Sequence, residues 1–203
     1  MRLMSVLFIS LCLMVTAAAP SLAAKDKKHG KHDGKMDEQA MMEEFKRLGT
    51  PGDPHKVLAS LEGSWQTKTK EWMEPGKPPM ESTGTADMKM LLDGRFLQQE
   101  LSGDMMGQPY KGLGVLGYDN LRKKYVTTWI DSMGTGIFYM EGTGSADGKT
   151  ITLKGSHAMP GGGSMTHRAI WKIVDENAQT FEMYGSHGKE KESKNMEITY
   201  TRK

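Results

Sequence analysis

The feature that most constrains the fold is an alternation of apolar and polar residues that begins at Trp65 and continues to the end of the chain. A period of two is typical of β-strands with one buried and one exposed face. Ten such runs lie at about 64–73, 80–91, 95–102, 110–118, 124–132, 136–143, 149–159, 164–174, 178–187 and 191–201. Short segments rich in Gly, Asp, Asn and Pro separate these runs, which predicts tight turns between consecutive antiparallel strands.

Ten strands joined by short connections, with no helix between them, form an antiparallel meander. A meander of this length usually closes on itself, because closure removes its two unpaired edges. We therefore predict an all-β fold, an up-and-down antiparallel β-barrel over residues 63–203. Met41, Phe45 and Leu48 recur at helical spacing, and Asp53-Pro54 is a typical helix start, so residues 37–62 are expected to form one or two short helices.

The N-terminal residues have the composition of a targeting segment. Residues 1–23 begin with Arg2, continue as an apolar run and end in Ser21-Leu22-Ala23, which is the pattern of a cleaved secretory signal peptide. The apolar run is shorter than the roughly 20 residues that span a bilayer. We therefore expect an exported protein, periplasmic or secreted, without a membrane span. Residues 24–36, rich in Lys, His and Gly, are expected to form a flexible tether.

The composition and the missing motifs argue against nucleic-acid binding and against several common classes of enzyme. The formal net charge is +2 with acidic and basic residues interspersed, so the chain lacks the one-sided basic field that nucleic-acid binding uses. The only cysteine, Cys12, lies inside the predicted signal peptide. The sequence has no Gly-x-Ser-x-Gly element, phosphate loop or paired-histidine zinc motif. Binding is therefore expected rather than catalysis, and neither a cofactor nor an oligomeric state follows from the sequence.

Several longer segments carry a family resemblance. LEGSW (61–65), LLDGRFLQQE (91–100), GLGVLGYDNLRKKYVTTWIDSMGTG (112–136) and SADGKTITLKG (145–155) together resemble the bacterial domain-of-unknown-function family 1579, over about residues 53–203. The resemblance implies a calycin-like or lipocalin-like barrel. It implies no catalytic residues, so function has to be inferred from the residues themselves.

The alternation also predicts what lines the barrel interior. Thr67 and Glu71 share a face with Trp65, opposite a face of lysines that prefer water. A ten-stranded barrel is wider than the eight strands that side chains just fill. We therefore predict a cavity for a small apolar or amphipathic molecule. The predicted ligand-binding residues are Trp65, Thr67, Glu71, Tyr125, Trp129, Asp131, His157, His167 and Trp171.

The hairpin at 149–174 supports an alternative function. With its PGGG loop centred near Gly162, His157 faces His167 and Met159 faces Met165. Imidazole and thioether groups are suitable ligands for copper or for haem iron. A metal or haem site formed by these four residues therefore stays open beside the simpler interpretation, a pair of hydrogen-bonded polar residues at the barrel mouth.

A third possibility concerns the interior carboxylates. If the turn of the 110–132 hairpin is centred on Leu121, Asp131 lies opposite Lys111, which favours an ion pair at the rim. The alternative is an enzyme in which Glu71 or Asp131 acts as a general acid or base, its pKa raised by a low-dielectric cavity.

Three glycines interrupt the strand at 110–118. Glycine inside a strand often marks a place where another group approaches closely. We expect Gly112, Gly114 and Gly117 to leave room for a neighbouring aromatic ring, either Trp129 or Tyr125.

Overall fold

The structure, a computed structural model, describes residues 37–105, 107–188 and 190–203. The predicted signal peptide (1–23) and tether (24–36) lie outside the described residues and stay predictions. The elements are α1 (Glu38–Gly49), α2 (Asp53–Ser60), β1 (Gly63–Glu71), β2 (Met80–Leu91), β3 (Phe96–Met105), β4 (Gln108–Asp119), β5 (Lys124–Asp131), β6 (Phe138–Gly144), β7 (Thr150–Ala158), β8 (Ser164–Ile173), β9 (Ala178–His187) and β10 (Ser193–Arg202).

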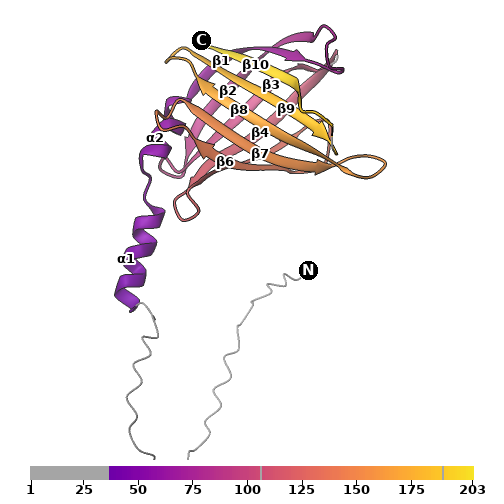
Figure 1. Ribbon diagram of the computed structural model, residues 1–203. Coiled ribbons are helices and arrows are strands. Elements are labelled where there is room, and N and C mark those ends of the chain that lie inside the picture. The colour runs from indigo at the N-terminus through magenta and orange to yellow at the C-terminus, as the bar shows by residue number, and fades with distance from the viewer. Residues whose placement is uncertain (1–36, 106, 189) are drawn as a thin grey trace, which may run out of the picture. The chain divides into compact units, whose positions relative to one another are not determined.

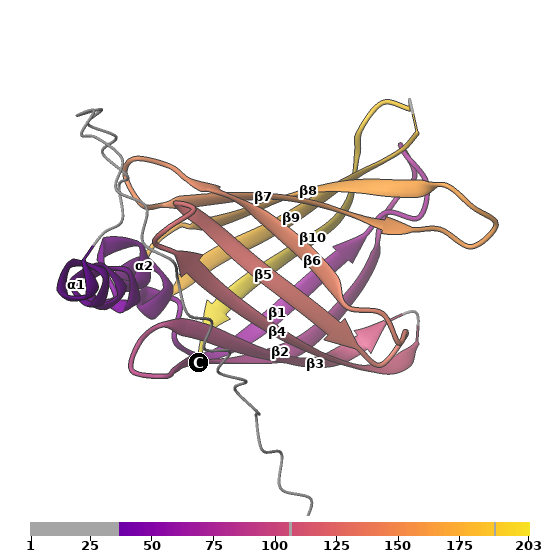
Figure 2. The same ribbon diagram turned by 90° about the horizontal axis from the view of Figure 1, so that it is seen from below.

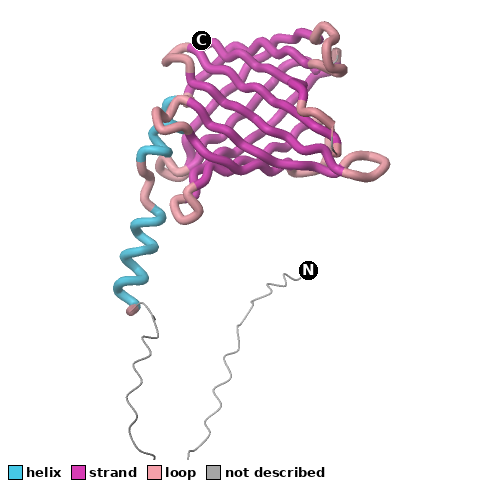
Figure 3. Tube along the Cα trace, viewed as in Figure 1, coloured by secondary structure: helices cyan, strands magenta, loops and turns pink. Residues whose placement is uncertain are grey.

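The ten strands form one closed antiparallel barrel, as predicted (Figures 1 and 2). Each strand pairs with the next one along the chain. β1 also pairs with β10, from Trp65 opposite Arg202 to Glu71 opposite Met196, and this seam closes the barrel. Figure 3 shows the predicted order of two short helices followed only by strands and turns.

Two local features start the helices. The Asp37 side chain caps α1 by accepting a hydrogen bond from Ala40 N at 2.8 Å. Pro54 lies in the first turn of α2, where the absence of an amide hydrogen costs nothing. The end of α1 is tied to the barrel by Asn120, whose side-chain amide donates to Leu48 O (2.8 Å) and Thr50 O (2.9 Å).

One end of the barrel is closed by α2, which packs against β2, β3 and β4 (Figure 1). Leu58 and Leu61 are almost fully buried there, together with Trp65, whose Nε1 donates to Leu61 O at 3.0 Å. The Arg202 guanidinium lies 4.2 Å above the Trp65 ring. We call this the plugged end. Consecutive strands alternate in direction, so the β1–β2, β3–β4, β5–β6, β7–β8 and β9–β10 connections lie at the opposite end, the far end.

The predicted register of the β4–β5 hairpin is wrong by one residue. Its turn holds four residues, 120–123, with Lys123 at a φ of 56°, so Asp131 lies opposite Gly112 and not opposite Lys111. A one-residue shift moves the paired side chains to opposite faces. Lys111 therefore points to solvent and Asp131 points inward, and the expected ion pair at the rim does not form.

The predicted register of the β7–β8 hairpin is wrong by two residues. Its loop is 159–163, so His157 lies opposite Met165 and His167 lies opposite Gly155. Gly161, Gly162 and Gly163 all have positive φ, which glycine adopts without strain, and this fixes the longer loop. A shift of two preserves the faces, because side chains alternate with a period of two. Both histidines therefore remain on the inner face.

Candidate ligand cavity

The barrel encloses a cavity of about 120 Å³ between the packed residues of the plugged end and the far end. An apolar cavity of about 150 Å³ holds one benzene molecule, so this volume suits a ligand of about one ring. Six aromatic side chains belong to the wall: Tyr110, Trp129, Phe138, Trp171, Phe181 and Tyr200. The apolar remainder is Leu101, Met105, Met140, Leu153, Met183, Met196 and Ile198, and the polar side chains are Thr67, Thr69, Glu71, Ser82, Gln99 and Thr127. Thr83 and Asp104 also border the cavity, but they occupy exposed positions on the outer faces of β2 and β3.

Glycines of β4 position Trp129 in this wall. A Cβ atom at Gly112 or Gly114 would overlap the Trp129 ring, so the absence of side chains lets the indole lie flat against β4. The predicted close approach of an aromatic ring to these two glycines is therefore confirmed. Gly117 faces the other way, and its neighbour is Phe96.

Tyr110 links Trp129 to Asp131 at the far end of the cavity. The indole Nε1 of Trp129 donates to the Tyr110 hydroxyl at 3.0 Å, and this hydroxyl donates to Asp131 Oδ2 at 3.3 Å. Burial raises the pKa of Tyr110 far above its usual value, so the hydroxyl stays protonated and keeps donating. Asp131 Oδ1 also accepts from Met133 N at 2.9 Å. Asp131 thus holds Tyr110 and the following loop in place.

Glu71 differs from Asp131 because its carboxylate faces the cavity itself. Burial raises the pKa of the Glu71 carboxyl above its usual value, and the nearby Asp104 carboxylate raises it further. Asp104 is more exposed and accepts a hydrogen bond from Gly107 N at 2.7 Å, which fixes the tight β3–β4 turn. Glu71 is therefore the carboxylate best placed to meet a ligand.

A second polar group lies deeper in the barrel and was missed by sequence reasoning. Gln99 on β3 is only 7% exposed, and its Nε2 donates to the Tyr200 hydroxyl on β10 at 3.0 Å. Gln99 shares the inner face with Leu97 and Leu101, so a polar residue at an apolar position of this strand was the available signal. Nearby, Trp171 Nε1 donates to Gln179 Oε1 at 2.5 Å, which fixes the indole in the wall.

The cavity brings together four of the predicted ligand-binding residues: Thr67, Glu71, Trp129 and Trp171. Two others, Trp65 and Tyr125, are buried in the plugged end and do not line the cavity.

The remaining three predicted residues do not line the cavity, but each contacts a residue that does. Asp131 is hydrogen-bonded to Tyr110, and the two histidines contact Phe138, whose ring packs edge-on against His157 (centroids 5.8 Å apart) and His167 (5.3 Å). His167 is 6% exposed.

The two histidines form a hydrogen-bonded pair. His167 Nε2 lies 3.1 Å from His157 Nδ1, and the ring planes differ by 15° with centroids 5.0 Å apart. One imidazole therefore donates and the other accepts. Burial lowers the pKa of His167, and His157 lowers it further. Within the described part of the chain, His167 Nδ1 is buried without a hydrogen-bond partner.

The metal or haem site stays a prediction. Met165 lies opposite His157 in the β7–β8 ladder, whereas Met159 lies in the loop beyond the strand. Among residues 37–105, 107–188 and 190–203, no group of three or more His, Cys, Asp or Glu is arranged to hold a metal ion. The available ligands are therefore the two imidazoles and a thioether. The absorption spectrum after addition of copper or haem is the direct test.

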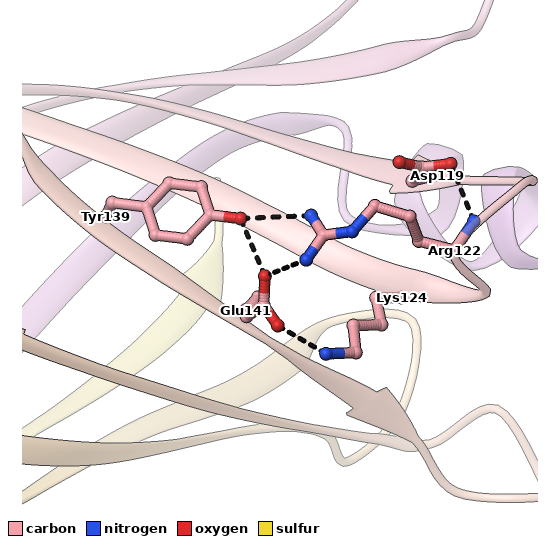
Figure 4. Close-up of polar contacts among 5 residues, drawn as sticks. All are labelled: Asp119, Arg122, Lys124, Tyr139 and Glu141. Atoms are coloured by element: carbon pink, nitrogen blue, oxygen red, sulfur yellow. Dashed lines mark hydrogen bonds and ion pairs between the residues drawn. The ribbon is translucent and has the colours of Figure 1, made fainter.

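A cluster on the outer surface of the barrel is structural (Figure 4). Glu141 accepts a hydrogen bond from the Tyr139 hydroxyl at 2.8 Å and forms ion pairs with Lys124 and Arg122. Hydrogen bonds from Lys124 and Arg122 lower the pKa of Glu141 to about 2. The backbone N of Arg122 donates to Asp119 Oδ1 at 2.9 Å. Because these groups satisfy one another, the cluster braces the β4–β5 turn against β6.

The fold and this interior define a closed antiparallel β-barrel with a small internal cavity. The chain belongs to the family described as protein of unknown function (DUF1579), whose model matches residues 50–202. No curated protein sequence matches the chain.

Two solved structures resemble the barrel. The crystal structure of Rv2717c from M. tuberculosis superposes with a TM-score of 0.58 at 16% identity, covering 76% of this chain and 99% of that one. A redesigned β-barrel gives a TM-score of 0.38 at 13% identity, covering 72% and 95%. At 16% identity the likeness to Rv2717c shows the fold alone. None of the helices in the described part of the chain is long and apolar enough to cross a membrane.

Proposed function

We propose that the barrel binds a small apolar or amphipathic molecule, about one ring in size, in its interior. The observation that supports this is a cavity of about 120 Å³ with aromatic walls and a few fixed polar groups. Small-molecule sites are usually built in this way, with apolar surface for affinity and a few polar groups for orientation.

The apolar wall alone supports only weak binding. A single aromatic ring buries about 150 Å². At about 25 cal/mol per Å² this contributes roughly 4 kcal/mol, which corresponds to a Kd of about 1 mM before the cost of association. Polar contacts with the ligand are therefore needed for tighter binding.

The test is calorimetric titration of the protein with benzyl alcohol, a one-ring amphipathic probe. Thr69 lines the cavity, so Thr69→Phe would fill it. Thr199→Phe introduces the same side chain on the outer, exposed face of β10 and is the matched control. We expect the wild type and Thr199→Phe to bind the probe with the same affinity, with a Kd of about 1 mM or weaker, and Thr69→Phe to bind it at least about tenfold more weakly.

Circular dichroism checks that both variants remain folded. Absence of binding to the wild-type protein would contradict the proposal. Equal affinities of the wild type and a folded Thr69→Phe variant would contradict it too, because the probe would then lie elsewhere.

A further inference from the structure

The cavity wall carries negative charge without a compensating positive one. Glu71 faces the cavity, and the carboxylate of Asp104, an exposed residue at the rim of the cavity, lies close enough to raise the pKa of Glu71. Among the described residues that line the cavity, none is Lys, Arg or His. The neighbouring lysines of β1, Lys68 and Lys70, project from the opposite face of the strand. A charged ligand entering this space therefore meets carboxylates only.

The carboxylates gather on one side of the far end. Glu71 ends β1, Asp104 lies near the end of β3 and Asp131 ends β5, and these strands belong to the contiguous half of the barrel from β1 to β5. Tyr110 lies among them, since its hydroxyl donates to Asp131 and its pKa is raised further by both Asp131 and Glu71. The histidine pair belongs to β7 and β8, in the other half of the barrel.

Two acceptor groups in the wall lack donors. The Glu71 carboxylate makes no hydrogen bond or ion pair with another described residue. Gln99, which also lines the cavity, uses its Nε2 to donate to Tyr200, and its Oε1 has no hydrogen-bond donor in the described part of the chain. An acceptor that lines the cavity and has no donor from the protein can accept from a ligand, so a ligand that supplies N–H donors gains hydrogen bonds here.

The aromatic rings of the cavity wall also favour a cationic ligand. Trp129 is held flat over Gly112 and Gly114, so one face of its indole is covered by β4 and the other is directed to the interior. The face of an aromatic ring attracts cations and contributes about 0.5–2 kcal/mol when water is excluded. A ligand carboxylate would instead be repelled by Glu71 at short range.

We propose that the ligand is a small primary amine, with its ammonium group paired with Glu71 and its hydrocarbon part among the aromatic side chains. Gln99 Oε1 supplies a second acceptor deeper in the cavity. The inference rests on the proposed function, because it names the chemical class of the molecule that the same cavity binds.

Three one-ring probes of similar size separate the possibilities: benzylamine, which is cationic at pH 7, benzyl alcohol, which is neutral, and benzoate, which is anionic. Each is titrated into the wild-type protein in a calorimeter at pH 7 and 150 mM salt. We expect benzylamine to bind at least about tenfold more tightly than benzyl alcohol, and benzoate to bind more weakly than both.

Two variants assign the preference to one carboxylate. Glu71→Gln keeps the size of the side chain and removes its charge, so benzylamine should fall to the affinity of benzyl alcohol while the alcohol is unaffected. Glu81→Gln is the matched control, since Glu81 is exposed on β2 and paired with Lys68 at 2.9 Å. It should keep the wild-type preference.

The outcomes distinguish the two proposals. If benzyl alcohol binds as tightly as benzylamine, the assignment of an amine ligand is wrong. If the preference for the amine persists in Glu71→Gln, the pairing of the ammonium group with Glu71 is wrong. In both cases the proposed cavity function stands. If none of the three probes binds, both proposals fail.

Discussion

At the scale of single residues, the two interior acids Asp131 and Glu71 have different roles. Asp131 accepts hydrogen bonds from Tyr110 and Met133, so its oxygens are occupied by the protein. Glu71 faces the cavity, and burial raises its pKa. Substitution of Asp131 should therefore disturb the position of Tyr110, whereas substitution of Glu71 should change the electrostatic preference of the cavity.

His167 gives a prediction about pH. Its pKa is lowered in the folded protein, so between that lowered pKa and the unfolded value of 6.5 the unfolded state binds more protons. Stability is therefore complete above pH 6.5 and is lost as the pH falls below it. We expect the free energy of unfolding to decrease between pH 7 and 5.5 by at most about 1.4 kcal/mol per pH unit for this group. His157, across the 3.1 Å hydrogen bond, is the nearest titratable neighbour.

The measurement is urea unfolding at several pH values. His167→Gln should flatten the decrease, because glutamine does not titrate. His187→Gln, a change at an exposed position of β9, should retain the wild-type profile. A His167→Gln variant whose stability falls with pH as steeply as that of the wild type would show that another group causes the dependence.

At the scale of elements, the strands and their inner faces could be predicted from the alternation, but the registers could not. The β4–β5 turn holds four residues with Lys123 at positive φ, and the β7–β8 loop holds five with three glycines at positive φ. Gly, Asp and Asn mark where a turn occurs, and they do not fix how many residues it contains. The error of one residue in the β4–β5 register placed Lys111 and Asp131 on the same face, whereas they lie on opposite faces. The error of two residues in the β7–β8 register kept both histidines on the inner face.

The short helix α2 gives the prediction for this scale. Leu58 is 0% exposed and fills the plugged end of the barrel. Leu58→Ala should lower the free energy of unfolding by about 2–5 kcal/mol, because the barrel rim prevents collapse around the lost side chain. Lys56→Ala on the exposed face of the same helix removes only a surface ion pair with Asp53, and it should leave the free energy of unfolding nearly unchanged.

Urea unfolding of the two variants compares them directly. A cost below about 1 kcal/mol for Leu58→Ala would show that α2 is not an integral part of the barrel. Benzyl alcohol affinity provides a second readout, and it should be unchanged in Leu58→Ala because the cavity wall does not include Leu58.

At the scale of the whole molecule, the cavity cannot be predicted from any single segment of the sequence. Closure joins β1 to β10, the most distant strands along the chain, and the space that remains depends on how the side chains of all ten strands fill the interior. Alternation could place Thr67, Glu71, Trp129 and Trp171 inside. The alternation could not show that Trp65 and Tyr125 pack in the core of the plugged end and not in the cavity wall. Their position depends on α2, which covers only that end of the barrel.

Closure also predicts how the molecule opens. Every strand is hydrogen-bonded on both sides, so no edge strand is available to detach first. Backbone amides in all ten strands should therefore exchange with deuterium at the rate set by global unfolding, including those of Thr67 and Tyr200 at the β1–β10 seam. Amides of α1, which has no buried residue, should exchange much faster. Hydrogen-exchange mass spectrometry with peptide resolution measures both. If seam peptides exchanged well before those of β4 and β5, the barrel would open along its side, and this opening would give ligands a route into the cavity.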